Sequence, residues 1–400
     1  MAGPPDDYGD ALRRAFEAAL ARAPGPMGAR ELEEICDDLL SRPPGQQRTL
    51  AANSRRVGRL EVCWQLVARS EALRHDEPPL MLEIARAAVR VAEALPEAWP
   101  SATLVADARA DAWAGLANAL RVMGELTAAE DAWSTADPYL EAGTGEPLIA
   151  ARFASLKGSL RLTQGRTREA IRFYRRAYRT YRRLGDPHLA ARALLSLALA
   201  YHRAGRLPAA IRAAYLGGKG LDPGREPELR LVAVHNLILY LDEAGCSFEA
   251  LALLRLAEPV YRLHGGQVAA LRRRWLESRL CHHAGEEAEA LRALAEVREG
   301  FLDLGLALDA ALAALELATA HAAAGRHEEV ARLASETYPV FLARGVDGEA
   351  LATLALLVQA VERNEATAGR IARLARRLGK GRDQPGPSGA AIRCNSFAPL

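Results

Sequence analysis

Apolar residues recur along this chain of 400 residues with the period of an α-helix. In the stretch TREAIRFYRRAYRTYRRLG (residues 167–185), five side chains gather on one side at 100° per residue: Ile171, Tyr174, Ala177, Tyr178 and Tyr181. No run of Val, Ile or Thr alternates with polar residues, as a half-buried strand would require. The pattern therefore predicts helices and no sheet.

Two rows of glycines divide these helical segments. The glycines of the first row are 41, 40, 40, 40 and 40 residues apart, at Gly124, Gly165, Gly205, Gly245, Gly285 and Gly325. A second row lies about twenty residues later, at Gly145, Gly185, Gly224, Gly265, Gly305 and Gly345. Glycine supplies the left-handed conformation that ends many helices. The spacing predicts a unit of helix, tight turn, helix and turn, repeated about every forty residues.

Small residues occupy fixed positions within each unit. Five residues after the first-row glycines come Ala129, Ala170, Ala210, Ala250, Ala290 and Val330. Seven residues before them come Ala117, Gly158, Ala198, Ile238, Ser278 and Ala318. Two helices approach closely only where side chains are short, so these columns predict where the helices of a pair cross.

The segments GRTREAIRFYRRAY (165–178) and AYHRAGRLPAAI (200–211) resemble the tetratricopeptide repeat family, and the resemblance recurs in register over residues 60–380. It implies an all-α fold, a right-handed solenoid of about seven antiparallel helix pairs. The period of 40 is longer than the family's usual unit of about 34 residues. A column of Pro138, Pro259 and Pro339 falls inside the second helices, where each proline should kink or restart its helix.

We expect three regions along the chain. Residues 1–56 form a helical N-terminal extension, residues 57–380 the tetratricopeptide-like solenoid, and residues 381–400 a disordered tail rich in Gly, Pro and Ser. The last pair of the solenoid is expected at 348–379. The tail ends in IRCNSFAPL, which is either a docking peptide or an unconstrained end.

Composition, charge and the N-terminal residues indicate the cellular compartment of the protein. The formal net charge is +2, the five cysteines show no CxxC spacing, and the N-terminus has no apolar signal region. These features predict a cytoplasmic protein without disulfides, membrane span or a polyanion partner for the whole chain. The arginine bias and the long repeat units suggest a bacterial source.

Candidate catalytic chemistry is sparse. The chain has no HExxH or GxGxxG motif, and the run GGKG at 217–220 lacks the strand that precedes a phosphate loop. Cys281, His282 and His283 form one Cys/His cluster, but adjacent helical residues point about 100° apart. We therefore expect no enzyme activity, no cofactor and no metal, and a structural or partner-contact role for that cluster.

The resemblance implies that the first helix of each pair lines a concave surface that binds a peptide or protein segment. The register places these candidate partner-binding residues there: Arg152, Arg192, Arg203, His235, Arg272, Trp275, Arg279 and His282. Arginine can hold a carboxylate through two parallel hydrogen bonds, and Trp and Arg are frequent binding hot spots. The partner is thus predicted to be a protein or peptide, and an acidic one would suit these arginines.

A basic ridge is predicted on the outer side of the second helix at 167–183, opposite its aromatics. Its residues are Arg168, Arg172, Arg175, Arg176, Arg179, Arg182 and Arg183. Residues 151–186 carry eleven basic and two acidic side chains, a local +9 that leaves −7 for the rest of the chain. The ridge is interpreted as a solvated face, a surface for an acidic protein or, less readily, a nucleic-acid surface.

Three functions follow from these observations. The first is a non-enzymatic protein–protein interaction scaffold that binds its partner on the concave surface. The second is a regulatory solenoid that senses a peptide or small ligand. The third, for which the sequence shows no separate DNA-reading motif, is nucleic-acid binding through the arginine ridge.

Overall fold

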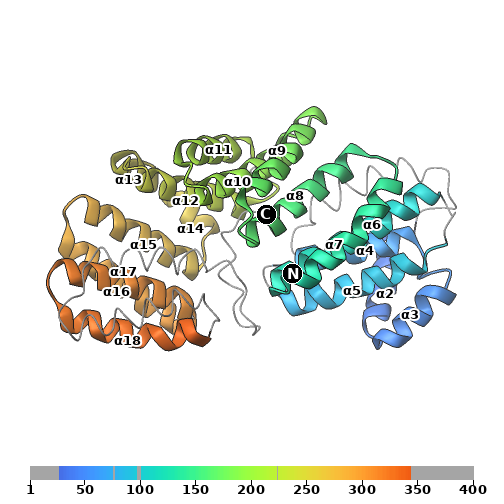
Figure 1. Cartoon of the computed structure of the whole chain (residues 1–400), viewed down its shortest axis with the longest axis horizontal. Helices are drawn as coiled ribbons and strands as arrows, with labels where there is room; N and C mark the ends of the chain where they lie inside the picture. The colour runs from blue at the N-terminus through green and yellow to red at the C-terminus, as the bar shows by residue number, and fades with distance from the viewer. Residues whose placement is uncertain (1–26, 75–76, 97–100, 223, 344–400) are drawn as a thin grey trace. The chain divides into compact units, whose positions relative to one another are not determined.

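The computed structural model describes residues 27–74, 77–96, 101–222 and 224–343. These residues form seventeen α-helices and no strand (Figure 1). The predicted all-α class is confirmed. The expected last pair at 348–379 and the tail lie outside the described residues, and no helix among the described ones is both long and apolar enough to cross a membrane.

The helices follow the predicted order of pairs. Two helices come first, α2 (Ala29–Leu40) and α3 (Pro44–Asn53). The first helices of the pairs are α4 (Leu60–Ala72), α6 (Ala102–Met123), α8 (Pro147–Thr163), α10 (Pro187–Arg203), α12 (Pro227–Glu243), α15 (Gln267–His283) and α17 (Ala307–Ala323). The second helices are α5 (Pro78–Ala94), α7 (Leu126–Ala142), α9 (Thr167–Arg183), α11 (Leu207–Gly220), α13 (Ser247–Leu256) with α14 (Glu258–His264), α16 (Glu287–Asp303) and α18 (His327–Ala343).

The chain divides into two compact units, an N-terminal unit that ends at Leu197 and a C-terminal unit that begins at Ala198. In the N-terminal unit, α6 packs against α7 and α8 against α9, around a core that includes Trp133, Phe153 and Tyr181. In the C-terminal unit, α12 packs against α13, α15 against α16 and α17 against α18. Each unit therefore buries apolar side chains between neighbouring helices, as stacked repeats do.

The turn prediction holds for the first row of glycines. All six have positive φ angles, from 69° at Gly205 to 85° at Gly124. In the second row, Gly145, Gly185 and Gly305 also adopt this conformation. The prediction was wrong at Gly224 and Gly265, which are not left-handed. At Gly265 a side chain would instead collide with the Tyr261 carbonyl oxygen, so close backbone approach requires glycine there.

The small columns mark the predicted helix crossings. Ala170 and Ala177 of α9 are fully buried. On the facing helix α8, a Cβ atom added at Gly158 would lie 2.7 Å from the Tyr174 ring. The ring of Tyr174 thus occupies the space that a side chain at position 158 would need.

The proline column behaves in two ways. At Pro259 the second helix breaks and restarts as α14, as predicted. At Pro138 and Pro339 the helices α7 and α18 run on through the proline. Of the expected kink or restart, the restart is confirmed at one of the three positions, and the helix continues without a break at the other two.

The cysteines of the described residues are free, and two are buried in the core of the N-terminal unit. Burial raises the pKa of the Cys36 thiol to about 11 and that of Cys63 to about 12. Thiols with such high pKa values stay protonated near neutral pH, which makes them poor nucleophiles.

Candidate functional site

Two of the predicted partner-binding arginines lie inside the helix stack. Arg152 of α8 is 3% exposed and forms ion pairs with Glu71 of α4 and Asp111 of α6. Arg272 of α15 is 4% exposed, and its Nη2 lies 3.6 Å from Oδ1 of Asp309 on α17. Both guanidinium groups are thus paired with buried carboxylates of neighbouring first helices, and the register that places them on one helix side does not make them accessible.

His235 is also largely enclosed. It is 9% exposed, and its Nδ1 lies 2.9 Å from the hydroxyl of Tyr261 on α14. Burial raises the pKa of the Tyr261 hydroxyl above its usual value, so this group stays protonated and can donate to the imidazole. His235 therefore joins α12 to the restarted half of its second helix.

Arg279 of α15 lies at the centre of a network that joins three first helices of the C-terminal unit. Its Nε is 3.0 Å from Oδ2 of Asp242 on α12, and its other nitrogens lie 3.9 Å from carboxylates of Glu243 and Glu316. Burial opposes the charged form, but the carboxylates of Glu316, Asp242 and Glu243 outweigh it, so the pKa of Arg279 is raised. The guanidinium stays charged and is already surrounded by acidic groups.

Trp275 and the two histidines lie beside this network. The Trp275 indole Nε1 donates to Glu316 at 2.7 Å, and its ring meets Phe301 edge-on with centroids 5.9 Å apart. His283 Nδ1 lies 2.7 Å from Asp242, whereas His282 pairs with Glu287 at 2.8 Å. We call Trp275, Arg279, Glu316 and His282 the first-helix face.

The exposed fractions of the side chains separate the accessible candidate residues from the buried ones described above. Trp275 is half-buried, and the side chains of Arg279 and His282 are 28% and 51% exposed. Arg203, at the end of α10 in the same unit, and Arg192, in the N-terminal unit, are half-buried. The described residues contain no cluster of His, Cys, Asp or Glu suited to a metal ion.

The second candidate surface is the basic ridge of α9. All seven predicted arginines are exposed, whereas Tyr174 and Tyr181 are 1% and 4% exposed. Phe173 and Tyr178 are half-buried, and the Arg182 guanidinium lies 5.8 Å from the Tyr178 ring centroid. The helical period therefore sorted this stretch correctly into an inner aromatic side and an outer basic side.

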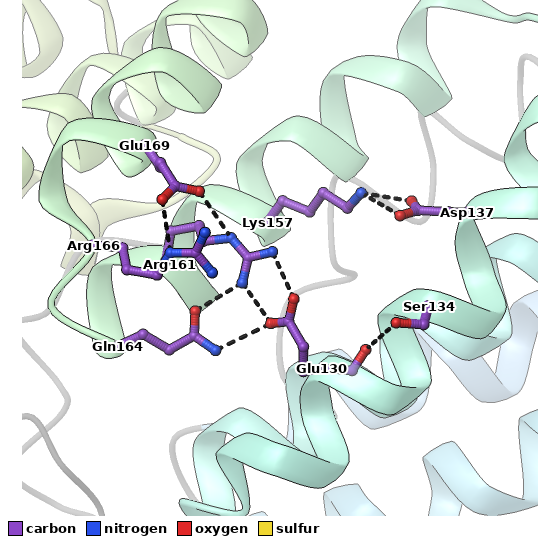
Figure 2. A network of polar contacts seen from close by, with 8 residues as sticks. All are labelled: Glu130, Ser134, Asp137, Lys157, Arg161, Gln164, Arg166 and Glu169. Atoms are coloured by element: carbon purple, nitrogen blue, oxygen red, sulfur yellow. Dashed lines mark hydrogen bonds and ion pairs between the residues drawn. The ribbon is translucent and has the colours of Figure 1, made fainter.

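A polar network fixes α9 to its neighbours (Figure 2). Arg161 of α8 binds Glu130 of α7 through two nitrogens, with Nη2–Oε1 at 2.7 Å, and Glu169 of α9 through Nε at 3.4 Å. Gln164 also donates to Glu130, and Arg166 to Glu169 at 2.7 Å. One guanidinium thus links the second helices α7 and α9.

Sequence reasoning did not pair the arginines and Trp275 of the first helices with their acidic partners. Asp111, Asp242, Asp309 and Glu316 lie 37 or 41 residues from the basic or aromatic groups they bind. This separation is close to one repeat, so the forty-residue period was the available signal. A search for opposite charges about one repeat apart would have found the partners Asp111, Asp242 and Asp309.

Comparison with known proteins agrees with the fold. A tetratricopeptide repeat model matches residues 150–215, while no curated protein matches the chain significantly. A Rap protein complexed with Competence and Sporulation Factor is similar with a TM-score of 0.58 at 13% identity, over 81% of this chain and 90% of that chain.

Two further solved structures show the same likeness. Aspartyl phosphate phosphatase F from Bacillus subtilis has a TM-score of 0.54 at 12% identity, over 92% of this chain and 98% of that one. The apo form of RapI has a TM-score of 0.53 at 10% identity, over 80% and 98%. The predicted resemblance is confirmed: residues 150–215 match the tetratricopeptide repeat model, and the chain shares the helical repeat fold of these solved structures.

Proposed function

We propose that the chain is a non-enzymatic interaction scaffold that binds a peptide or protein segment on the first-helix face of the C-terminal unit. The observation that carries this proposal is the half-buried Trp275, whose indole lies beside the charged groups Arg279 and Glu316 on consecutive first helices. An accessible indole next to paired charges offers an apolar anchor and hydrogen-bonding groups to one bound segment.

The chemistry of the face refines the expected ligand. Arg279 is balanced by Asp242, Glu243 and Glu316, so the described face is not strongly basic. A bound segment would combine an apolar side chain for Trp275 with a mixture of charges. An entirely acidic ligand suits this face less well than the arginines of the sequence suggested.

A second candidate is a regulatory solenoid that senses a ligand. One structural neighbour was solved with Competence and Sporulation Factor bound, and likeness at 13% identity supports the fold alone. The specific observation is that Arg279 bridges α12, α15 and α17. A ligand group that takes over one of its carboxylates would change the contacts between three helices.

The test is selection of binding peptides from a random peptide library on the full chain, followed by affinity measurement with single variants. We expect Trp275→Ala and Arg279→Ala each to weaken the selected peptides about tenfold or more. Arg212→Ala, on an exposed arginine of α11, should leave their affinity unchanged. Peptides that bind both face variants as tightly as the natural chain would overturn the proposal.

The two candidate functions differ in a second measurement. Hydrogen exchange of α12 and α17 should slow locally if the chain is a passive scaffold, at the contacts of the bound peptide. A sensor predicts altered exchange along all three bridged helices, including the part of α12 that lies away from the peptide.

A further inference from the structure

The basic ridge lies on α9, whereas the first-helix face lies on α15 and α17. The ridge is therefore considered as a separate binding surface. Its seven arginines are exposed along a helix of seventeen residues. At 100° and about 1.5 Å per residue they fall within a sector of about 120° and extend over roughly 22 Å. The ridge is therefore narrow and straight, about as wide as one helix.

In the part of the chain that the structure describes, several ridge arginines are not ion-paired. Within the described residues, no acidic side chain forms an ion pair with Arg168, Arg172, Arg176 or Arg179. By contrast, two arginines that precede α9 in the chain are ion-paired: Arg161 with Glu130 and Arg166 with Glu169 (Figure 2). The positive charges of these four arginines are thus not neutralised by ion pairs with described residues and are available to an external anion.

The surroundings of the ridge limit how wide that anion can be. Helix α7, which Arg161 links to α9, contains four acidic residues and no basic one. Two of its carboxylates, Asp131 and Glu141, are exposed. A nucleic-acid duplex, whose major groove alone is about 12 Å wide, would extend beyond a single helix of about 10–12 Å toward this acidic neighbour. The rings of Tyr174 and Tyr181 are buried and those of Phe173 and Tyr178 are half-buried, so α9 offers no row of open rings on which the bases of a single strand could stack.

We propose that the α9 ridge docks an acidic helical segment of a partner protein, with carboxylates repeated along one side. Such a helix matches the ridge in width and has the same spacing of charges, because acidic residues at i, i+4, i+7 and i+11 line one helical side. Arginine and carboxylate can then form parallel charge-assisted hydrogen bonds along both helices. This docking goes beyond the proposed function and does not depend on ligand binding at the first-helix face.

The test is fluorescence anisotropy with the full chain and three labelled probes. The first is an alanine- and glutamine-based helical peptide of about 18 residues with glutamates on one side at the spacing above. The second has the same composition with its glutamates distributed around the helix, and the third is a DNA duplex of similar length. All are measured at about 0.15 M ionic strength, where nonspecific attraction between separated charges is screened.

The expected result has two parts. The one-sided peptide should bind about tenfold more tightly than its scrambled form and more tightly than the duplex. Simultaneous Arg172→Glu, Arg176→Glu and Arg179→Glu should weaken it at least about tenfold, whereas a matched variant with Arg86→Glu, Arg230→Glu and Arg255→Glu should change its affinity less than about twofold. The matched arginines are exposed on three other helices, so both variants change the net charge equally.

Each contrary result overturns the proposal in a defined way. Equal binding of the two peptides would exclude recognition of a patterned helix. A duplex that binds as tightly as the one-sided peptide would identify a nucleic-acid surface. Equal weakening in the ridge and matched variants would show an effect of total charge. A helical circular dichroism spectrum and a cooperative urea unfolding transition confirm that the ridge variant is folded, so this test does not depend on the outcome for the proposed function.

Discussion

The arginines of α8 and α15 have the same side chain as those of α9 but lie in opposite environments. Arg152 and Arg272 are about 4% exposed and paired with carboxylates on adjacent first helices. The ridge arginines are exposed and crowd one side of a single helix. The buried pairs act between repeats, while Arg168, Arg172, Arg176 and Arg179 of the ridge have no acidic ion-pair partner among the described residues. Residue type therefore does not separate structural from interacting arginines, but the position of the opposite charge does.

The buried ion pair between Arg272 and Asp309 should show the largest effect on the free energy of unfolding. Arg272→Met leaves the Asp309 carboxylate, which is fully buried, without its guanidinium. Breaking a buried ion pair in this way costs about 3–5 kcal/mol, because the remaining charge stays desolvated. The free energy of unfolding from urea titration measures the loss.

A double variant and a surface control complete this test. Arg272→Met combined with Asp309→Leu should recover most of the lost stability, since both charges are then removed. Arg212→Met, on an exposed arginine, should change the free energy of unfolding by less than about 0.5 kcal/mol. A single variant as stable as this control would show that Arg272 contributes nothing to the join between α15 and α17.

The ion pair between the half-buried Arg161 and Glu130 should have an intermediate effect on the free energy of unfolding, and this effect should depend on pH. Hydrogen bonding from Arg161 lowers the pKa of Glu130 below its usual 4.5. Because the folded pKa is depressed, the stability from this pair is complete above the unfolded value and is lost as pH falls through the folded one. Glu130→Gln should reduce the free energy of unfolding by about 1 kcal/mol at neutral pH, a modest amount because Glu130 is partly exposed.

The pH dependence distinguishes this pair from a simple packing effect. The stability difference between the natural chain and Glu130→Gln should shrink as the urea titrations are repeated at decreasing pH. Asp131→Asn, on the next residue and exposed, should show little difference at any pH. A difference that stays constant into the acid range would mean that Glu130 acts through something other than its charge.

The sequence predicted the helices well and the burial of individual arginine side chains poorly. Helical period and the Gly124-to-Gly325 row depend on local backbone preferences, which a single sequence displays directly. The same period correctly turned Tyr174 and Tyr181 inward. It also placed Arg152 and Arg272 on the side expected to meet a partner, yet it carries no information on how closely the next helix approaches. That distance depends on packing between repeats, and Asp111 and Asp309 are visible as partners only once the helices are stacked.

The ridge should show the smallest effect on stability, with a sign opposite to that of the buried pair. Arg176 has Arg172 four residues before it and Arg179 three residues after it, and like charges at these spacings destabilise a helix. Arg176→Glu replaces both repulsions with attractions, so the free energy of unfolding should rise by about 0.5–1 kcal/mol. Arg212→Glu is the control, because no charged residue lies three or four positions from it.

A stabilised Arg176→Glu variant that also binds the one-sided acidic peptide more weakly would show that the ridge favours binding at the expense of helix stability. A destabilised variant would instead make Arg176 part of the packing of α9, and the contrast with Arg272 would no longer hold.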